Sequence, residues 1–159
     1  MKILVNSYYN FAQNTAGGVY SKVINYIHSA KDSDLTIKQF DVWNDKVIDY
    51  DIIHYFALKA EFMDQMYMAK KLGKKIVISS IADAKKTRLK IKFGRYLHLQ
   101  TNENIRQSML QMADAIITET HKEKDYIVEA YGIDPAKIHV IPNGVSEEIL
   151  DGDPELIMG

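Results

Sequence analysis

The sequence has 159 residues, of which 47% are hydrophobic and 26% are charged, and its formal net charge is −1. That length suits a single domain with a core of its own, and the balanced charge argues against a polyanion as the partner of the whole molecule. The chain has no cysteine, which excludes a disulfide framework, a thiolate metal site and a cysteine nucleophile. No apolar stretch is long enough to span a membrane or to form the core of a signal peptide, so we expect a cytoplasmic protein.

Short strand patterns alternate with helical patterns along the chain. Strands are predicted at residues 3–5, 35–40, 51–56, 75–79, 115–118 and 138–141. Helices are predicted over residues 18–31 and 59–72, from near residue 102 to residue 112, and from residue 121 to Gly132. Within this pattern, Thr120-x-x-Glu123 predicts a capping box, and Gly73 suits the position after a helix end.

This alternation predicts an α/β fold: one domain built on a Rossmann-like, doubly wound parallel sheet with helices on both faces. Ligands of such sheets bind beyond the C-terminal ends of the strands. The loops that begin at Asn6, Phe56, Ser79 and Thr118 are therefore the places to look for a site.

A glycine pair precedes the first predicted helix. Gly17 and Gly18 would let a ligand approach the backbone closely, and the free N–H groups of a helix N-terminus favour phosphate. The dinucleotide fingerprint is incomplete, because no third glycine follows Gly18. A tight turn without a ligand is the alternative.

A second pattern lies near the C-terminal end. Residues 113–145 read strand, capped helix, glycine, proline, lysine, strand, and then Ile141-Pro142-Asn143-Gly144-Val145. This stretch resembles the retaining glycosyltransferases of the GT-B fold (the large group 1 or family 4 type), whose N-terminal domains close on the same order of elements. The Gly17-Gly18 loop is their other landmark, and Asp51-Ile52-Ile53-His54 resembles one of their strands.

The resemblance implies two Rossmann-like domains that face each other across a cleft. Residues 1–145 would be the acceptor-side N-terminal domain, one half of a GT-B fold, and residues 146–159 the start of the interdomain linker. The missing C-terminal domain would hold the nucleotide-sugar. The intact enzyme would transfer a hexose-type sugar to a glycan or lipid-linked acceptor in cell-envelope or polysaccharide biosynthesis. No metal, no further cofactor and no nucleic acid is implied, and the isolated chain is expected to be inactive.

The resemblance also names candidate contacts, although it assigns no catalytic residue. Gly17 and Gly18 would lie against the phosphates or the sugar of the donor. Many relatives carry a histidine at the end of the fourth strand, where this chain has Ser79 and Ser80. These two could bond a sugar hydroxyl or simply end the strand. Thr118 and Asn143 are further candidates for sugar or acceptor contacts.

A basic segment lies between the fourth strand and the next helix. No acidic residue stands between Asp83 and Glu103, and residues 83–100 fit either a helix or a strand. Such a segment suits an anionic membrane surface or acceptor, which would place the protein on the inner face of the membrane. A solvated helix face is the alternative. The basic residues are Lys85, Lys86, Arg88, Lys90, Lys92 and Arg95.

Two other functions compete with glycosyl transfer. A flavodoxin-like binding or signalling module has the same sheet, but Asn6-Ser7-Tyr8 lacks the acidic residues of a phosphoacceptor, and Tyr8-Tyr9-Asn10 does not supply a flavin phosphate loop. A non-catalytic partner subunit of a two-chain glycosyltransferase is compatible with every pattern above. The Asp-x-Asp and paired-glutamate matches stand in turns or in the expected linker, so we interpret them as coincidences.

Overall fold

The computed structural model describes residues 1–7, 18–30, 33–80 and 102–143. One six-stranded sheet runs through this part of the molecule, in the order β2-β1-β3-β4-β5-β6, and every neighbouring pair is parallel. The predicted parallel sheet is therefore confirmed. Its strands are β1 (Lys2–Ser7), β2 (Thr36–Gln39), β3 (Ile52–Phe56), β4 (Lys75–Ser79), β5 (Ala115–Thr118) and β6 (Ile138–Val140).

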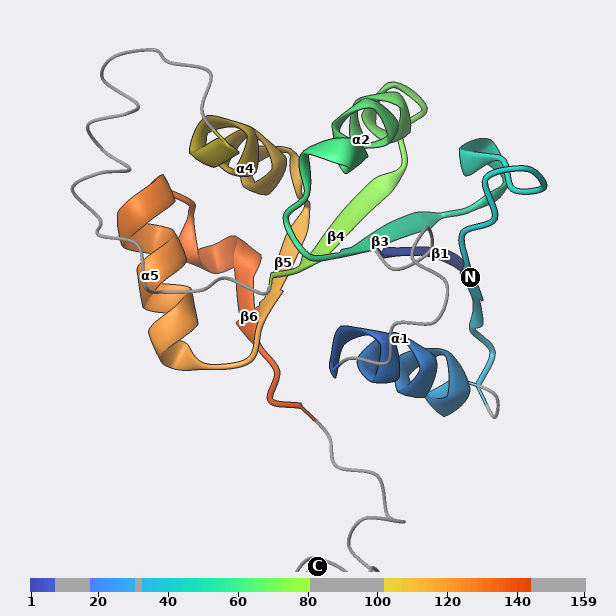
Figure 1. The fold of residues 1–159 in the computed structure, drawn as a ribbon, viewed down its shortest axis with the longest axis horizontal. Coiled ribbons are helices and arrows are strands. Elements are labelled where there is room, and N and C mark those ends of the chain that lie inside the picture. The colour runs from blue at the N-terminus through green and yellow to red at the C-terminus, as the bar shows by residue number, and fades with distance from the viewer. Residues whose placement is uncertain (8–17, 31–32, 81–101, 144–159) are drawn as a thin grey trace, which may run out of the picture.

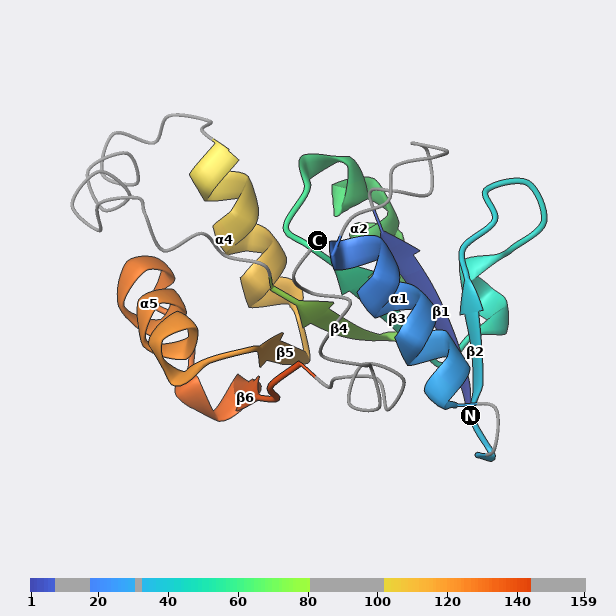
Figure 2. The same cartoon turned by 60° about the horizontal axis from the view of Figure 1, so that its bottom comes forward.

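Helices of the described residues cover both faces of the sheet, as predicted, but unequally. One face carries α2 (Met63–Lys71), α4 (Asn102–Met112) and α5 (His121–Tyr131), whereas α1 (Gly18–Ser29) lies on the other (Figure 1). Seen from the α1 side, α1 lies over β1 and β3 (Figure 2). Because β1 pairs with both β2 and β3, the strand order reverses at β1, which is the point where α/β sheets bind ligands.

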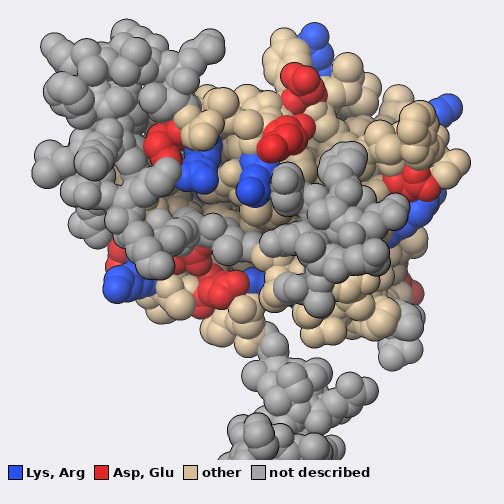
Figure 3. All heavy atoms as spheres, viewed as in Figure 1, with Lys and Arg blue, Asp and Glu red and all other residues tan. Residues whose placement is uncertain are grey.

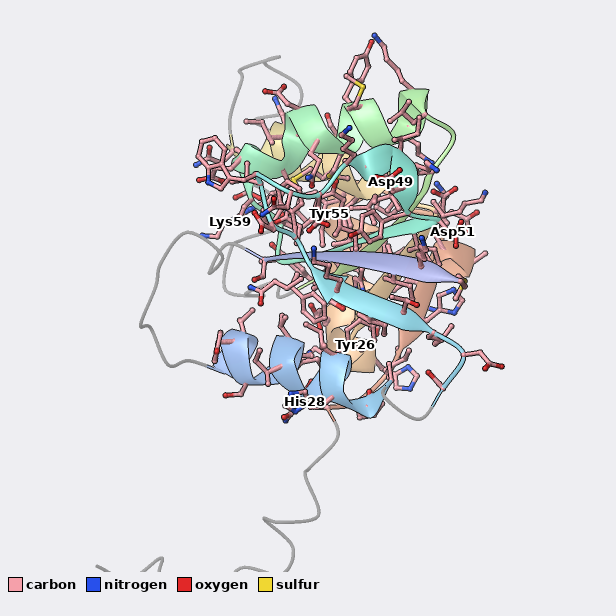
Figure 4. All side chains as sticks on the ribbon, turned by 90° about the vertical axis from the view of Figure 1, so that its right-hand side faces the viewer. Tyr26, His28, Asp49, Asp51, Tyr55 and Lys59 are labelled. Atoms are coloured by element: carbon pink, nitrogen blue, oxygen red, sulfur yellow. The ribbon has the colours of Figure 1, made fainter. Side chains whose placement is uncertain are left out.

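The alternation of side chains along each strand assigns residues to the two faces. Ile53 and Tyr55 of β3 join the core under α2, α4 and α5, while Phe56 joins the core under α1. Figure 4 shows Tyr55 on the α2 side of the sheet and Tyr26 on the α1 side. His54 stands between Ile53 and Tyr55, so the period of two directs it towards α1.

The helix ends follow the sequence patterns. Thr120 Oγ1 accepts a hydrogen bond from the Glu123 backbone N–H at 3.1 Å, which confirms the cap at the start of α5. The Glu123 carboxylate in turn accepts from the backbone N–H of Glu119 at 2.9 Å. Gly132 ends α5 with φ of 66°, and Gly73 follows α2 with φ of 69°. Both are left-handed conformations that glycine adopts without strain.

In the described part of the chain, three short 3-10 helices depart from the predicted elements. The helix predicted from residue 59 begins as η3 (Ala60–Phe62) before α2, and η2 (Val47–Asp49) and η4 (Pro135–Lys137) occupy segments with no predicted helix. Proline at the first position of η4 fits a helix start, and Asp134 caps it by accepting from the Ala136 N–H at 2.9 Å.

Several predictions fall outside the described residues. Gly17, the basic segment from Lys85 to Arg95 and the expected linker at 146–159 lie there, so the choice between helix and strand for residues 83–100 stays open. Among the side chains that can be placed, acidic and basic groups are interspersed on the face shown in Figure 3.

Candidate functional site

A cavity lies on the α1 side of the sheet. It has a volume of about 760 Å³ and lies between α1, the α1-facing side chains of β3 to β5, and the segment after β6. Gly18 at the start of α1 and Asn143 after β6 both line it. The cavity is large enough for a small organic ligand.

The side of α1 that lines the cavity is polar. Ser21, Lys22, Asn25 and Ser29 recur at spacings of three and four residues, which places them on one side of the helix. Val23, by contrast, packs into the small core under α1. One side of α1 therefore packs against the sheet, and the adjacent side presents hydroxyl, amide and ammonium groups to the cavity.

A buried histidine–serine pair forms part of the sheet side of the cavity. His54 Nε2 lies 2.9 Å from Ser79 Oγ, and both residues line the cavity. The His54 ring stacks on Phe56 at a centroid distance of 4.5 Å and meets the edge of Tyr26 at 5.1 Å. Burial, and secondarily the charge of Lys22, lowers the pKa of His54 to about 3. His54 is thus neutral at physiological pH, with one ring nitrogen as donor and the other as acceptor.

The place of this pair matters because many members of the resembled family carry a histidine at the end of the fourth strand. Ser79 stands at the end of β4, where that histidine is absent, and the imidazole of His54 approaches the same point from β3. His54 is only 3% exposed, and its hydrogen bond means that Ser79 Oγ already has one partner where it lines the cavity.

An ion pair links α1 to the carboxyl ends of β5 and β6. Lys22 of α1 binds Glu119, which follows β5, with the two side chains 25% and 35% exposed. The hydrogen bond from Lys22 lowers the pKa of Glu119, and a further hydrogen bond from Asn143 acts in the same direction. Lys22 is thereby held at the cavity with its charge balanced by a carboxylate.

The cavity unites some of the residues singled out in the sequence and leaves out others. Gly18, Ser79 and Asn143 line it. Ser80 instead donates its hydroxyl to Glu123 at 2.6 Å on the far side of the sheet. Thr118 Oγ1 is fully buried and has no hydrogen-bond partner in the described part of the chain.

Sequence reasoning missed Lys22 and Glu119 and named His54 as part of a strand that resembles one of the family's. His54 is packed, and it also lines the cavity. The polar stripe of α1 was readable, because Lys22 follows Gly18 by one helical turn. No local pattern indicated Glu119, which lies 97 residues away from its partner.

The described ranges contain no cluster of three or more side chains suited to a metal ion. Across the same ranges, no helix has the length and apolar character that crossing a bilayer requires.

Comparisons with known proteins identify the family. No curated protein sequence matches the chain. Residues 19–149 match the family described as Glycosyltransferase Family 4, and this region includes Lys22, His54, Ser79, Glu119 and Asn143. The match agrees with the parallel six-stranded sheet and its flanking helices. The chain thus belongs to glycosyltransferase family 4, as a GT-B-type glycosyltransferase domain.

Proposed function

We propose that the chain is the acceptor-side N-terminal domain of an enzyme that transfers a hexose-type sugar from a sugar nucleotide to a glycan or lipid-linked acceptor. The observation that carries this proposal is the convergence of Gly18, Lys22, Ser79 and Asn143 on one cavity. The sugar nucleotide acts as a co-substrate, and the reaction uses no further cofactor.

The start of α1 is the proposed contact for the donor's phosphates or sugar. Gly18 begins α1, whose first N–H groups have no partner within the helix. A Cβ built on Gly18 would meet nothing within 4 Å, so a ligand can approach the backbone there. Lys22, one turn further, lines the same cavity, and its ammonium can donate to a ligand oxygen as well as to its partner Glu119.

The histidine–serine pair is the proposed contact for sugar hydroxyls. Ser79 Oγ already bonds His54 Nε2 and keeps capacity for another partner in the cavity. Asn143 brings an amide with donors and an acceptor to the same cavity. Fixed groups of this kind orient a substrate, and orientation lowers the barrier to transfer.

A second domain completes the site in this proposal. The nucleotide of the donor would bind mainly to that domain, which faces the carboxyl edge of the sheet. The 159-residue chain alone should then bind sugar nucleotides weakly in calorimetry and transfer no sugar. Robust transfer by these residues alone would contradict the assignment.

Attachment to the inner face of the membrane is a separate proposal, and it rests on the basic segment alone. Liposome co-sedimentation tests it: binding should require anionic lipid and weaken with salt. A variant with all six basic residues changed to Gln should stay in the supernatant. If it still binds, the membrane proposal is wrong and the transferase proposal is unaffected.

The decisive test of the transferase proposal is Gly18→Leu in the protein that includes the donor-binding domain. We expect kcat/KM to fall by about 100-fold or more, because the side chain would occupy the space of the ligand. Tyr20→Leu is the matched control, since Tyr20 is exposed on the same turn and does not line the cavity. A Gly18→Leu enzyme as active as the control would refute the role of α1.

A further inference from the structure

The segment that follows β2 presents an aromatic side chain at the functional edge of the sheet. Trp43 is 90% exposed, and its neighbour Val42 is 55% exposed. The Phe40 N–H donates to the Val5 carbonyl at 2.7 Å, which holds the start of this segment beside β1. Residues 40–46 therefore lie at the carboxyl edge, next to the strand where the order of the sheet reverses.

The backbone under Trp43 is fixed by its own hydrogen bonds. Asp41 Oδ1 accepts from the Trp43 N–H at 2.9 Å, and Asp41 Oδ2 accepts from the Asn44 amide at 2.7 Å. The Asp41 N–H donates to Asp45 Oδ2 at 2.8 Å, and the Asp45 N–H donates back to the Asp41 carbonyl at 2.9 Å. These bonds join residue 41 to residues 43, 44 and 45, and so fix the backbone on both sides of Trp43.

Two hydrogen bonds to residues outside the loop connect it to the rest of the domain. Asp45 Oδ1 accepts from Lys38 Nζ of β2 at 2.8 Å and from the Tyr50 hydroxyl at 2.5 Å. Tyr50 belongs to the main core. An exposed tryptophan on a braced loop loses little conformational entropy on binding a ligand.

The chemistry around the indole limits what can bind there. Asp41 and Asp45 contribute two carboxylates to this loop, whereas Lys38, paired with Asp45, and the exposed Lys46 contribute two ammonium groups. The surface thus carries no net positive charge that would attract an anionic lipid or a polyphosphate. It suits a neutral ligand with an apolar face and a polar rim, because the indole face attracts C–H groups while carboxylate and amide groups accept and donate hydrogen bonds.

We propose that Trp43 is a stacking platform for a neutral sugar ring of the acceptor, so that the acceptor is a glycan of several units. This inference rests on the proposed function and sharpens it. The spacing of the strands puts β2 about 10 Å from β3, whose His54 and Phe56 line the cavity. Trp43 therefore holds a unit remote from the reacting hydroxyl, and such remote contacts help to position the reacting end.

The chain offers a direct probe, because Trp43 is its only tryptophan. The 159-residue chain would be titrated with neutral hexasaccharides of glucose and mannose in several linkages. We expect at least one of them to change the tryptophan emission saturably and to protect it from acrylamide quenching. The absence of any such change up to the solubility limit of every hexasaccharide would overturn the proposal.

Variants measured by calorimetry separate stacking from a change elsewhere. Trp43→Ala should weaken the binding of that hexasaccharide by about 10-fold or more, and Trp43→Tyr should keep most of it. Tyr67→Ala is the matched control, because Tyr67 is an exposed aromatic residue on α2 and should leave the affinity unchanged. Equal binding by wild type and Trp43→Ala would overturn the proposal.

Other occupants give different results. A blue shift of the emission with phosphatidylcholine vesicles, with or without phosphatidylglycerol, would assign Trp43 to a lipid surface and overturn the proposal. An emission that depends on protein concentration would assign it to self-association, with the same consequence. If hexasaccharides fail while Gly18→Leu abolishes transfer, the platform is wrong and the proposed function stands. If Gly18→Leu also leaves transfer intact, the proposed function fails with it.

Discussion

The two faces of the sheet differ in how they are held together. Within the described residues, 20 buried residues form one core cluster under α2, α4 and α5, whereas the cluster under α1 has three: Val5, Val23 and Phe56. The α1 side instead has the cavity, the His54–Ser79 pair and the Lys22–Glu119 pair. Burial of apolar surface dominates stability. The face under α2, α4 and α5 therefore stabilises the domain, and the α1 face offers binding groups.

The largest effect on stability is expected at two neighbouring isoleucines of β5, which test the difference between the two faces of the sheet. Ile116 is fully buried in the large cluster, while Ile117 is partly buried and lines the cavity. Ile116→Ala should lower the free energy of unfolding by about 3 kcal/mol and Ile117→Ala by about 1 kcal/mol, because only the first opens a closed void. Urea denaturation of both variants measures the difference. Equal losses would mean that the α1 face is packed as tightly as the other.

The next largest expected effect is a loss of stability at acidic pH, and it depends on His54. Its folded-state pKa of about 3 lies below the usual 6.5, so the unfolded chain binds a proton that the folded chain does not. Stability therefore falls as pH drops below 6.5, by about 2 kcal/mol between pH 7 and pH 5. Asp41, Asp45, Asp114 and Glu119 have lowered pKa values and lose their contribution only at lower pH.

Denaturation at both pH values, with His54→Gln as the comparison, isolates this contribution. Gln is neutral at every pH and can still bond Ser79, so the variant should lose less stability on acidification than the wild type. If both lose the same amount, the imidazole is more accessible to water than its burial indicates.

The sequence predicted the fold because the fold follows from local patterns. The apolar runs of the strands, the Thr120 cap and the glycines at 73 and 132 each depend on neighbouring residues, and each prediction was confirmed. Membership of the glycosyltransferase family was predicted for a related reason, since the motif over residues 113–145 is continuous in the chain.

The site was less predictable because its contacts cross the sheet. Ser79 was named, but its partner His54 stands 25 residues away on the next strand, and only the register of β3 and β4 brings the two together. Lys22 and Glu119 meet across 97 residues. The exposure of Trp43 depends on hydrogen bonds among Asp41, Asp45 and Tyr50 that no periodicity encodes.

A smaller effect is expected at the Lys22–Glu119 ion pair on the α1 face. Glu119→Gln should lower the free energy of unfolding by less than about 1 kcal/mol, and less at high salt, because both partners are partly exposed. Asp125→Asn, which removes an exposed negative charge on α5, is the control for net charge. Urea denaturation at low and high salt measures both variants. A large, salt-insensitive loss at Glu119 would show that the α1 face also contributes to stability.

The smallest effect is expected at Gly18, and a second glycine provides its control. A Cβ at Gly18 or at Gly73 would meet nothing within 4 Å, but only Gly73 has a positive φ, of 69°. Gly18→Ala should therefore change the free energy of unfolding by no more than about 0.5 kcal/mol, whereas Gly73→Ala should lower it by about 1 kcal/mol through backbone strain. Thermal denaturation ranks the two variants. Because Gly18 has room for a side chain, a loss of turnover in Gly18→Leu without a loss of stability would mean that the space is kept for a ligand; a clear destabilisation by Gly18→Ala would mean that α1 needs glycine for its own backbone.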